Sequence, residues 1–224
     1  MSVSIEQLLQ QNSARLWRAR ETGSSAAAAV PAGLPTGYAA LDRCLPGAGW
    51  PRQGLIEILS DQRGIGELRL LLPALAALCR DEGAADDVYP PPHDLGSGGW
   101  IAWVSPPYRP YAPSLAAWGI DVGRMLVVNG AGATEWAMDQ ALRSESCSAV
   151  LGWANPRDPH ALRRLQLAAE ASRSLAVLYR PLQAGLTPSP AVLRLALLGG
   201  GTEGLQVRIV KSRGGRPATV NLGH

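Results

Sequence analysis

The chain has 224 residues, of which 46% are hydrophobic, and its formal net charge is only +3. This composition predicts a globular domain with a sizeable core, and no apolar run approaches the ~20 residues that a membrane-spanning helix needs. The three cysteines lie far apart without metal-ligand spacing, and the N-terminus lacks the apolar core of a signal peptide. We therefore expect a cytoplasmic protein without a metal site.

Residues 1–20 predict an amphipathic helix that precedes the domain. Its apolar side chains recur at about helical spacing and have arginines around them. These apolar positions are Ile5, Leu8, Leu9, Leu16 and Trp17. Residues 21–33 are small and polar without periodicity, which predicts a flexible linker. A tethered helix either folds back on its own domain or docks on a partner, such as a second copy of the chain, and the sequence leaves both open.

Residues 34–224 predict one α/β domain in which strands and helices alternate. Short apolar runs predict strands at 55–59, 100–105, 125–128, 147–153 and 175–179. The intervening segments predict helices at 67–80, 110–119, 134–144 and 158–172, the last one capped by Asp158, and a loop at 81–99. Strands separated by helices of this length indicate parallel βαβ units.

The C-terminal part departs from this alternation. Residues 191–198 and 205–212 predict two strands joined by a glycine-rich turn, with Leu205, Val207 and Ile209 on one face of the second strand. A hairpin at this place predicts an antiparallel edge on a mostly parallel sheet.

The loop after the first strand occupies the place of a phosphate-binding P-loop without having its chemistry. A working P-loop reads GxxxxGK[ST], in which backbone N–H groups and the lysine hold phosphate and the hydroxyl holds Mg²⁺. The loop here consists of Ser60, Asp61, Gln62, Arg63, Gly64, Ile65, Gly66 and Glu67. It has no lysine, and Glu67 takes the place of the hydroxyl. We expect Glu67 to cap the next helix and to repel a triphosphate.

Two further strands lack the acids of an ATPase. The strand ending at Val104 continues into Ser105-Pro106-Pro107-Tyr108, and the strand ending at Trp153 continues into Ala154-Asn155-Pro156. A P-loop ATPase carries at such strand ends an acid for Mg²⁺ and another that orients water. The sequence therefore predicts no ATP hydrolysis, no catalytic residue and no cofactor.

Basic and aromatic residues provide candidate contact surfaces. Arg208, Lys211, Arg213 and Arg216 follow one another near the C-terminus and either contact DNA or an acidic partner, or form a solvated strand end. Five tryptophans are candidates for stacking on bases, and those in expected strands are more simply core residues: Trp100, Trp103, Trp118, Trp136 and Trp153. The proline-rich loop with Tyr108 and Tyr111 is either a docking loop or a stiff connection.

The order of these segments resembles the RecA ATPase core. The opening LPTGYAALDRCLPGAGWPRQGLIEIL is similar to the entry of RecA-type proteins, through Thr36-Gly37, Leu41-Asp42, Gly54 and the strand that follows. The segments WVSPPYRPYAPSLAAWGID, ALRSESCSAVLGW, LRRLQLAAEASRSLAVLYRP and VRIVKSRGG resemble the ImuA family, RecA-like proteins of translesion mutagenesis operons. The resemblance runs from about residue 34 to residue 216 and includes no catalytic signature.

This resemblance implies a RecA-like fold and a non-catalytic accessory factor of SOS-induced translesion DNA synthesis. Its implied partner is ImuB, an inactive Y-family polymerase homologue, and RecA, an error-prone replicative-type polymerase and DNA are further candidates. Residues 66–181 also resemble the SulA cell-division inhibitor, which blocks assembly of FtsZ. SulA-type proteins lack the RecA-like entry at residues 34–59, so an inhibitor of this kind is the alternative.

Overall fold

The computed structural model describes residues 31–62, 64, 66–80, 99–130, 132–199 and 204–223. The expected helix over 1–20, the linker up to residue 30 and the loop over 81–98 lie outside these residues, as do Arg63 and Ile65. The unit described below begins at Ala32.

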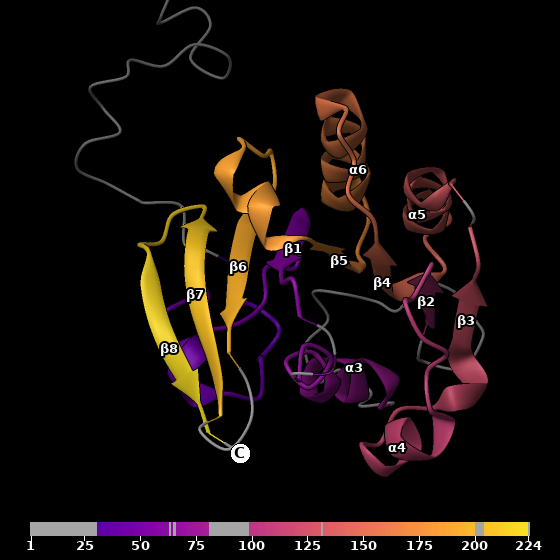
Figure 1. The fold of residues 1–224 in the computed structure, drawn as a ribbon. Helices are drawn as coiled ribbons and strands as arrows, with labels where there is room; N and C mark the ends of the chain where they lie inside the picture. The colour runs from indigo at the N-terminus through magenta and orange to yellow at the C-terminus, as the bar shows by residue number, and fades with distance from the viewer. Residues whose placement is uncertain are drawn as a thin grey trace, which may run out of the picture. The chain divides into compact units, whose positions relative to one another are not determined.

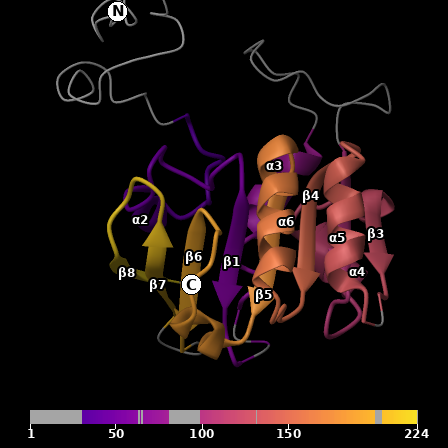
Figure 2. The ribbon, with the colours of Figure 1, turned by 90° about the horizontal axis from the view of Figure 1, so that it is seen from above.

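An eight-stranded sheet forms the centre of this unit, with strands in the order β3-β2-β4-β5-β1-β6-β7-β8. The strands are β1 Leu55–Leu59, β2 Trp100–Val104, β3 Met125–Val128, β4 Cys147–Trp153, β5 Leu175–Arg180, β6 Leu193–Leu198, β7 Leu205–Ser212 and β8 Ala218–Leu222. Neighbours from β3 to β6 are parallel, whereas β6, β7 and β8 are antiparallel. The mostly parallel sheet with an antiparallel C-terminal edge is thus confirmed. Figure 2 shows β3 and β8 at its two ends.

Helices cover both faces of the parallel part of the sheet (Figure 1). One face carries α3 Leu72–Cys79 and α4 Ala112–Ala117, and the other carries α5 Thr134–Arg143 and α6 Pro159–Ala171. The short elements are α2 Ala39–Asp42, η2 Val122–Arg124 and η3 Leu182–Leu186. All five residues of β1 are buried, because this strand lies between two neighbouring strands and is covered on both faces of the sheet. The loop after β1 therefore starts from the interior of the sheet.

The helix after this loop begins five residues later than its apolar pattern predicts. The expected helix over 67–80 is α3 Leu72–Cys79, with Pro73 in its first turn. Proline has no N–H group and is tolerated in a helix only in the first turn, so Pro73 fixes the start there. The expectation that Glu67 caps this helix is therefore wrong, because turns separate it from Leu72.

The C-terminal edge contains one strand more than expected. After the hairpin of β6 and β7, the chain turns again and adds β8 Ala218–Leu222 along β7. Alternate residues Val220 and Leu222 are buried under the sheet. The alternation in ATVNL is the signal that the sequence reading missed. The edge is therefore a three-stranded antiparallel unit.

The segment that resembles the start of RecA-type proteins packs against the core of the domain. The backbone N–H of Thr36 donates to Asp42 Oδ1 at 3.0 Å, and Leu41 is fully buried. Gly37 has a φ of +85°, and a Cβ there would overlap the ring of Pro73. These residues join the start of the domain to α3, so their pattern reflects packing.

Candidate functional site

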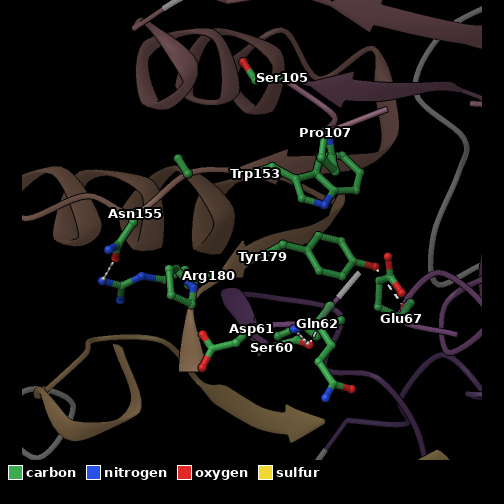
Figure 3. Close-up of a pocket in the computed structure, with 13 residues that line it drawn as sticks. Ser60, Asp61, Gln62, Glu67, Ser105, Pro107, Trp153, Asn155, Tyr179 and Arg180 are labelled. Carbon is green, nitrogen blue, oxygen red and sulfur yellow. Dashed lines mark hydrogen bonds between the residues drawn. The ribbon is translucent and has the colours of Figure 1, made fainter. Parts of the chain in front are cut away.

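A pocket of about 370 Å³ opens at the carboxyl ends of β1, β2, β4 and β5. This end of a parallel sheet is where α/β proteins usually bind ligands. The polar lining residues are Ser60, Asp61, Gln62, Glu67, Ser105, Asn155 and Arg180. Figure 3 shows them around an aromatic wall, with Glu67 at one end of the group and Arg180 with Asn155 at the other. The loop predicted to be a degenerate P-loop thus borders the pocket.

The backbone of this loop is directed toward its own carboxylate. The N–H of Gly64 donates to Glu67 Oε1 at 2.9 Å, and the N–H of Gln62 donates to Ser60 Oγ at 3.2 Å. In a working P-loop, N–H groups of the loop bind phosphate oxygens instead. Glu67 Oε2 is buried and has no hydrogen-bond partner among the described residues. The loop therefore carries a negative charge where a phosphate would need a positive one.

Stacked aromatic rings form the apolar wall of the pocket. The rings of Trp153 and Tyr179 are 4.7 Å apart and nearly parallel, with an interplanar angle of 4°, and Trp103 stacks behind Trp153 at 5.6 Å. Tyr179 donates its hydroxyl hydrogen to the backbone carbonyl of Glu67 at 3.2 Å. This hydrogen bond joins β5 to the loop and holds Glu67 at the pocket.

We expect the stability of the domain to fall above about pH 10 because of Tyr179. Burial raises the pKa of its hydroxyl well above the usual value of 10.0, and the charge of Glu67 raises it further. The folded state then keeps a proton that the unfolded state releases, so this stability is complete below pH 10 and is lost as the pH rises. Urea titrations from pH 8 to pH 11 should show the loss, at up to about 1.4 kcal/mol per pH unit.

The matched control for this pH dependence is Tyr179→Phe, which cannot ionise. Its stability should be lower than that of the original chain at pH 8 because the hydrogen bond to Glu67 is missing. Between pH 10 and pH 11, its stability should fall less steeply. Parallel pH curves for the two chains would contradict the assignment to Tyr179.

A buried ion cluster lies behind the pocket. Glu57, in the middle of β1 and fully buried, accepts from Arg180 Nη1 at 3.0 Å and from Arg194 Nε at 2.7 Å. Ser189 donates to the same carboxylate at 2.6 Å, and Arg180 also donates to Asn155 Oδ1 at 3.1 Å. The sequence reading missed this cluster. Its signal was a charged residue inside each of three apolar strands, in LIEIL, LAVLYR and LRLALL.

The C-terminal basic segment is only partly available for a partner. Arg208 and Arg216 are exposed. Lys211, however, donates to the backbone carbonyl of Ser189 at 2.8 Å, and Arg213 pairs with Glu170 at 3.1 Å. Burial lowers the pKa of Lys211, and the charges of Arg194 and Arg213 lower it further. Contact of this segment with DNA or an acidic partner stays a prediction, and Lys211 already has an internal role.

The residues at the positions where an ATPase has its acids make other hydrogen bonds. Ser105 has a φ of +54°, and its hydroxyl lies 2.7 Å from that of Thr134, at the start of α5. Asn155 belongs to the hydrogen-bond network of Arg180. In the described part of the chain, no group of three or more His, Cys, Asp or Glu side chains could hold a metal ion.

The tryptophans divide between core and surface. Trp103 is 1% exposed and Trp153 is half-buried, as expected of core residues in strands. Trp100, Trp118 and Trp136 are exposed, so the core prediction, which was made for tryptophans in strands, is wrong for Trp100. Trp100 lies at the first residue of β2, and the other two follow or lie on helices at the surface.

Exposed apolar residues gather at one end of the sheet. Eight of the ten large exposed apolar side chains described come from the segment 100–136: Trp100, Tyr108, Tyr111, Trp118, Val122, Leu126, Val127 and Trp136. We call these eight residues the β3-edge surface; they lie on both faces of the sheet, because α4 and α5 cover opposite faces and side chains alternate along β3. The segment comprises β2, α4, η2, β3 and the start of α5, which Figures 1 and 2 place at the β3 end. Neither Tyr108 nor Tyr111 is covered by the rest of the described chain.

Comparison with known proteins finds a local similarity. No protein-family model matches the chain. A protein described as cell division inhibitor SulA, from Edwardsiella piscicida, is 38% identical over 84 residues, which cover 37% of this chain and 50% of that protein. The match thus spans half of that relative. A crystal structure of SulA from Pseudomonas aeruginosa is 22% identical, with a TM-score of 0.41, and the match covers 56% of this chain and 97% of that one.

The 38% identity over 84 residues supports the expected resemblance to SulA over part of the chain. The resemblance to ImuA and to the RecA core stays a prediction from the sequence. No helix among the residues described here is both long enough and apolar enough to cross a membrane.

Proposed function

We propose that this protein acts by binding another protein and does not hydrolyse nucleotides. The hydrogen bond from the Gly64 N–H to Glu67 Oε1 is the observation that carries this proposal. It directs the loop toward an internal carboxylate, so a triphosphate would meet a negative charge in place of lysine and Mg²⁺. The pocket walls also lack acids after β2 and β4 that could hold a metal and orient water.

The β3-edge surface supports a protein partner. β3 pairs only with β2 in the described part of the chain, so its other side has backbone N–H and C=O groups without a neighbouring strand. Its side chains Leu126 and Val127 are 48% and 43% exposed. An apolar edge strand without charge or proline is a template for pairing with another polypeptide. Exposed apolar surfaces of this kind mark protein-binding sites.

The partner in this proposal belongs to the bacterial response to DNA damage, and inhibition of cell division is the first candidate. The match to a protein described as a cell division inhibitor supports it. In this case the chain binds FtsZ and prevents its assembly, as the resemblance to SulA implies. The mechanism requires binding alone, in agreement with the chemistry of the loop.

Accessory action in translesion DNA synthesis is the second candidate. The match to the SulA protein covers 37% of this chain. The entry segment at 34–59, which SulA-type proteins lack, is built into the core through Leu41, Trp50 and β1. These features, together with the motifs that resemble ImuA, favour binding to ImuB and to RecA. We include a RecA-like fold in this proposal. The position of β1 inside the sheet, with a loop at its carboxyl end, supports it.

Nucleotide addition tests the non-catalytic part. Millimolar Mg-ATP should leave the melting temperature unchanged, because a ligand stabilises only the state that it binds. A concentration of 100 times Kd would instead add about 2.7 kcal/mol of stability. A clear rise in the melting temperature, or release of phosphate, would overturn this part of the proposal.

Partner capture tests the rest. The full chain, immobilised, is offered FtsZ, ImuB and RecA from the same organism, and FtsZ assembly is followed with and without the chain. Capture of FtsZ with loss of assembly supports the first candidate, and capture of ImuB or RecA supports the second. Capture of none of the three would overturn both. A chain that lacks residues 1–20 shows in the same assay whether the expected helix contributes.

A further inference from the structure

The pocket at the carboxyl ends of β1, β2, β4 and β5 has a lining that suits a positively charged group. Asp61 and Glu67 are carboxylates of the lining, and Arg180 is its one basic residue among the described residues. Arg180 is neutralised by Glu57, which also holds Arg194. The lining together with the Glu57 ion cluster behind it thus contains three carboxylates and two guanidinium groups. Glu67 has no cationic partner among the described residues.

Two polar atoms of the lining are buried without a hydrogen bond among the described residues. They are Glu67 Oε2, which accepts hydrogen bonds, and Arg180 Nε, which donates one. The side chain of Arg180 is only 4% exposed. A buried charged group that lacks a partner loses hydration without compensation. A ligand that fits the pocket therefore brings a donor to the Glu67 end and an acceptor to the Arg180 end, which Figure 3 shows on opposite sides.

The wall between these two ends is apolar. Trp153 and Tyr179 form a nearly parallel stack, and Ile58 and Pro107 also line the pocket. A long basic side chain buries its aliphatic stem on such a surface while its charged head stays polar. Arginine suits the pocket better than lysine, because its planar guanidinium matches the geometry of a carboxylate.

We propose that this pocket binds an arginine side chain of a partner polypeptide. The guanidinium group lies at the Glu67 carboxylate, the stem lies along Trp153 and Tyr179, and a main-chain carbonyl of the same segment accepts from Arg180. The proposal rests on the protein-binding function and names the side chain that the partner inserts. The loop that takes the place of a P-loop thus recognises the opposite charge.

The test is calorimetric titration of the full chain with two capped peptides. The probe is acetyl-Gly-Arg-Gly-amide, and its control has citrulline, which is close in shape to arginine but uncharged. We expect the arginine peptide to bind about tenfold more tightly or better, because its guanidinium pairs its positive charge with the Glu67 carboxylate, whereas the neutral urea of citrulline only donates hydrogen bonds to it. Equal affinity of the two peptides would overturn the proposal.

Glu67→Gln is the variant that isolates the charge. Glutamine keeps an oxygen that can accept from the Gly64 N–H, so the loop retains its hydrogen bond. We expect it to lower the affinity for the arginine peptide about tenfold and to leave the citrulline peptide unaffected. Glu145→Gln removes an exposed charge outside the pocket and should not change either affinity. An unchanged affinity in Glu67→Gln, with an unchanged melting temperature, would also overturn the proposal.

The two proposals fail in different ways. Preference for the arginine peptide together with capture of no candidate partner overturns the proposed function and supports the pocket assignment. Capture of a partner without any arginine preference overturns the pocket assignment and supports the proposed function.

Discussion

Replacing Glu57 by glutamine should destabilise the domain by about 3–5 kcal/mol. Glu57 is fully buried and holds two arginines whose side chains are 4% and 5% exposed. The amide of glutamine can replace one hydrogen bond but leaves both guanidinium groups without a counter-charge. A buried ion pair adds little net stability, yet removing one partner is costly because the other charge stays in a low dielectric.

Urea denaturation at pH 7 measures this effect as a lower transition midpoint at an unchanged slope. Because domains of this kind are stable by about 5–15 kcal/mol, the loss removes a large share of the total. Glu145→Gln is the matched control, since Glu145 is exposed, and it should change stability by less than about 0.5 kcal/mol. A Glu57→Gln chain as stable as the original would show that the cluster is relaxed or hydrated.

Charges placed on β3 should weaken partner capture at least tenfold. The double variant Leu126→Glu, Val127→Glu introduces two carboxylates on opposite faces of the edge strand, where a partner strand or an apolar surface would lie. Residues at the centre of an interface commonly contribute 2 kcal/mol or more, and 1.4 kcal/mol corresponds to a factor of ten in Kd. The measurement is the Kd of the captured partner by surface plasmon resonance.

Both positions are about half exposed, so the double variant should keep its melting temperature within a few degrees. Leu167→Glu and Leu186→Glu are matched controls, because they add the same charge at exposed leucines on α6 and η3. The controls should bind the partner as the original chain does. Equal loss in the controls would point to net charge as the cause, and undiminished binding of the double variant would remove the β3 edge from the proposed interface.

Much of the fold follows from local pattern in the sequence. Buried parallel strands are short apolar runs, and LIEIL and LAVLY predict β1 and β5 to within one residue. The cap at α6 was equally local, since the Asp158 side chain accepts from the N–H of His160 at 2.9 Å. The limits of such prediction appear at α3, where Leu68, Leu70 and Leu71 continue the apolar pattern before the helix and only the position of Pro73 marks its start.

Features that depend on neighbours in space were not available in this way. β8 was missed because its five residues are only half apolar, and it forms by pairing with β7. The exposure of Trp100 was also missed, because burial of a strand end depends on which layer covers it. The N-terminal helix and the degenerate loop were both predicted from the sequence. The helix lies outside the described residues, whereas the structure gives contacts for Glu67 and its neighbours in the loop.

The sequence by itself determined what this protein lacks, and the tertiary structure decided what the same residues form. The loop lacks the lysine of the P-loop pattern and has Glu67 at the position of its Ser or Thr, and both facts can be read from spacing alone, so no structure was needed to expect no hydrolysis. The Trp153–Tyr179 wall and the Glu57 cluster join segments that lie far apart in the sequence, up to 137 residues in the case of Glu57 and Arg194. Such contacts arise from strand order and side-chain direction, which local patterns do not encode.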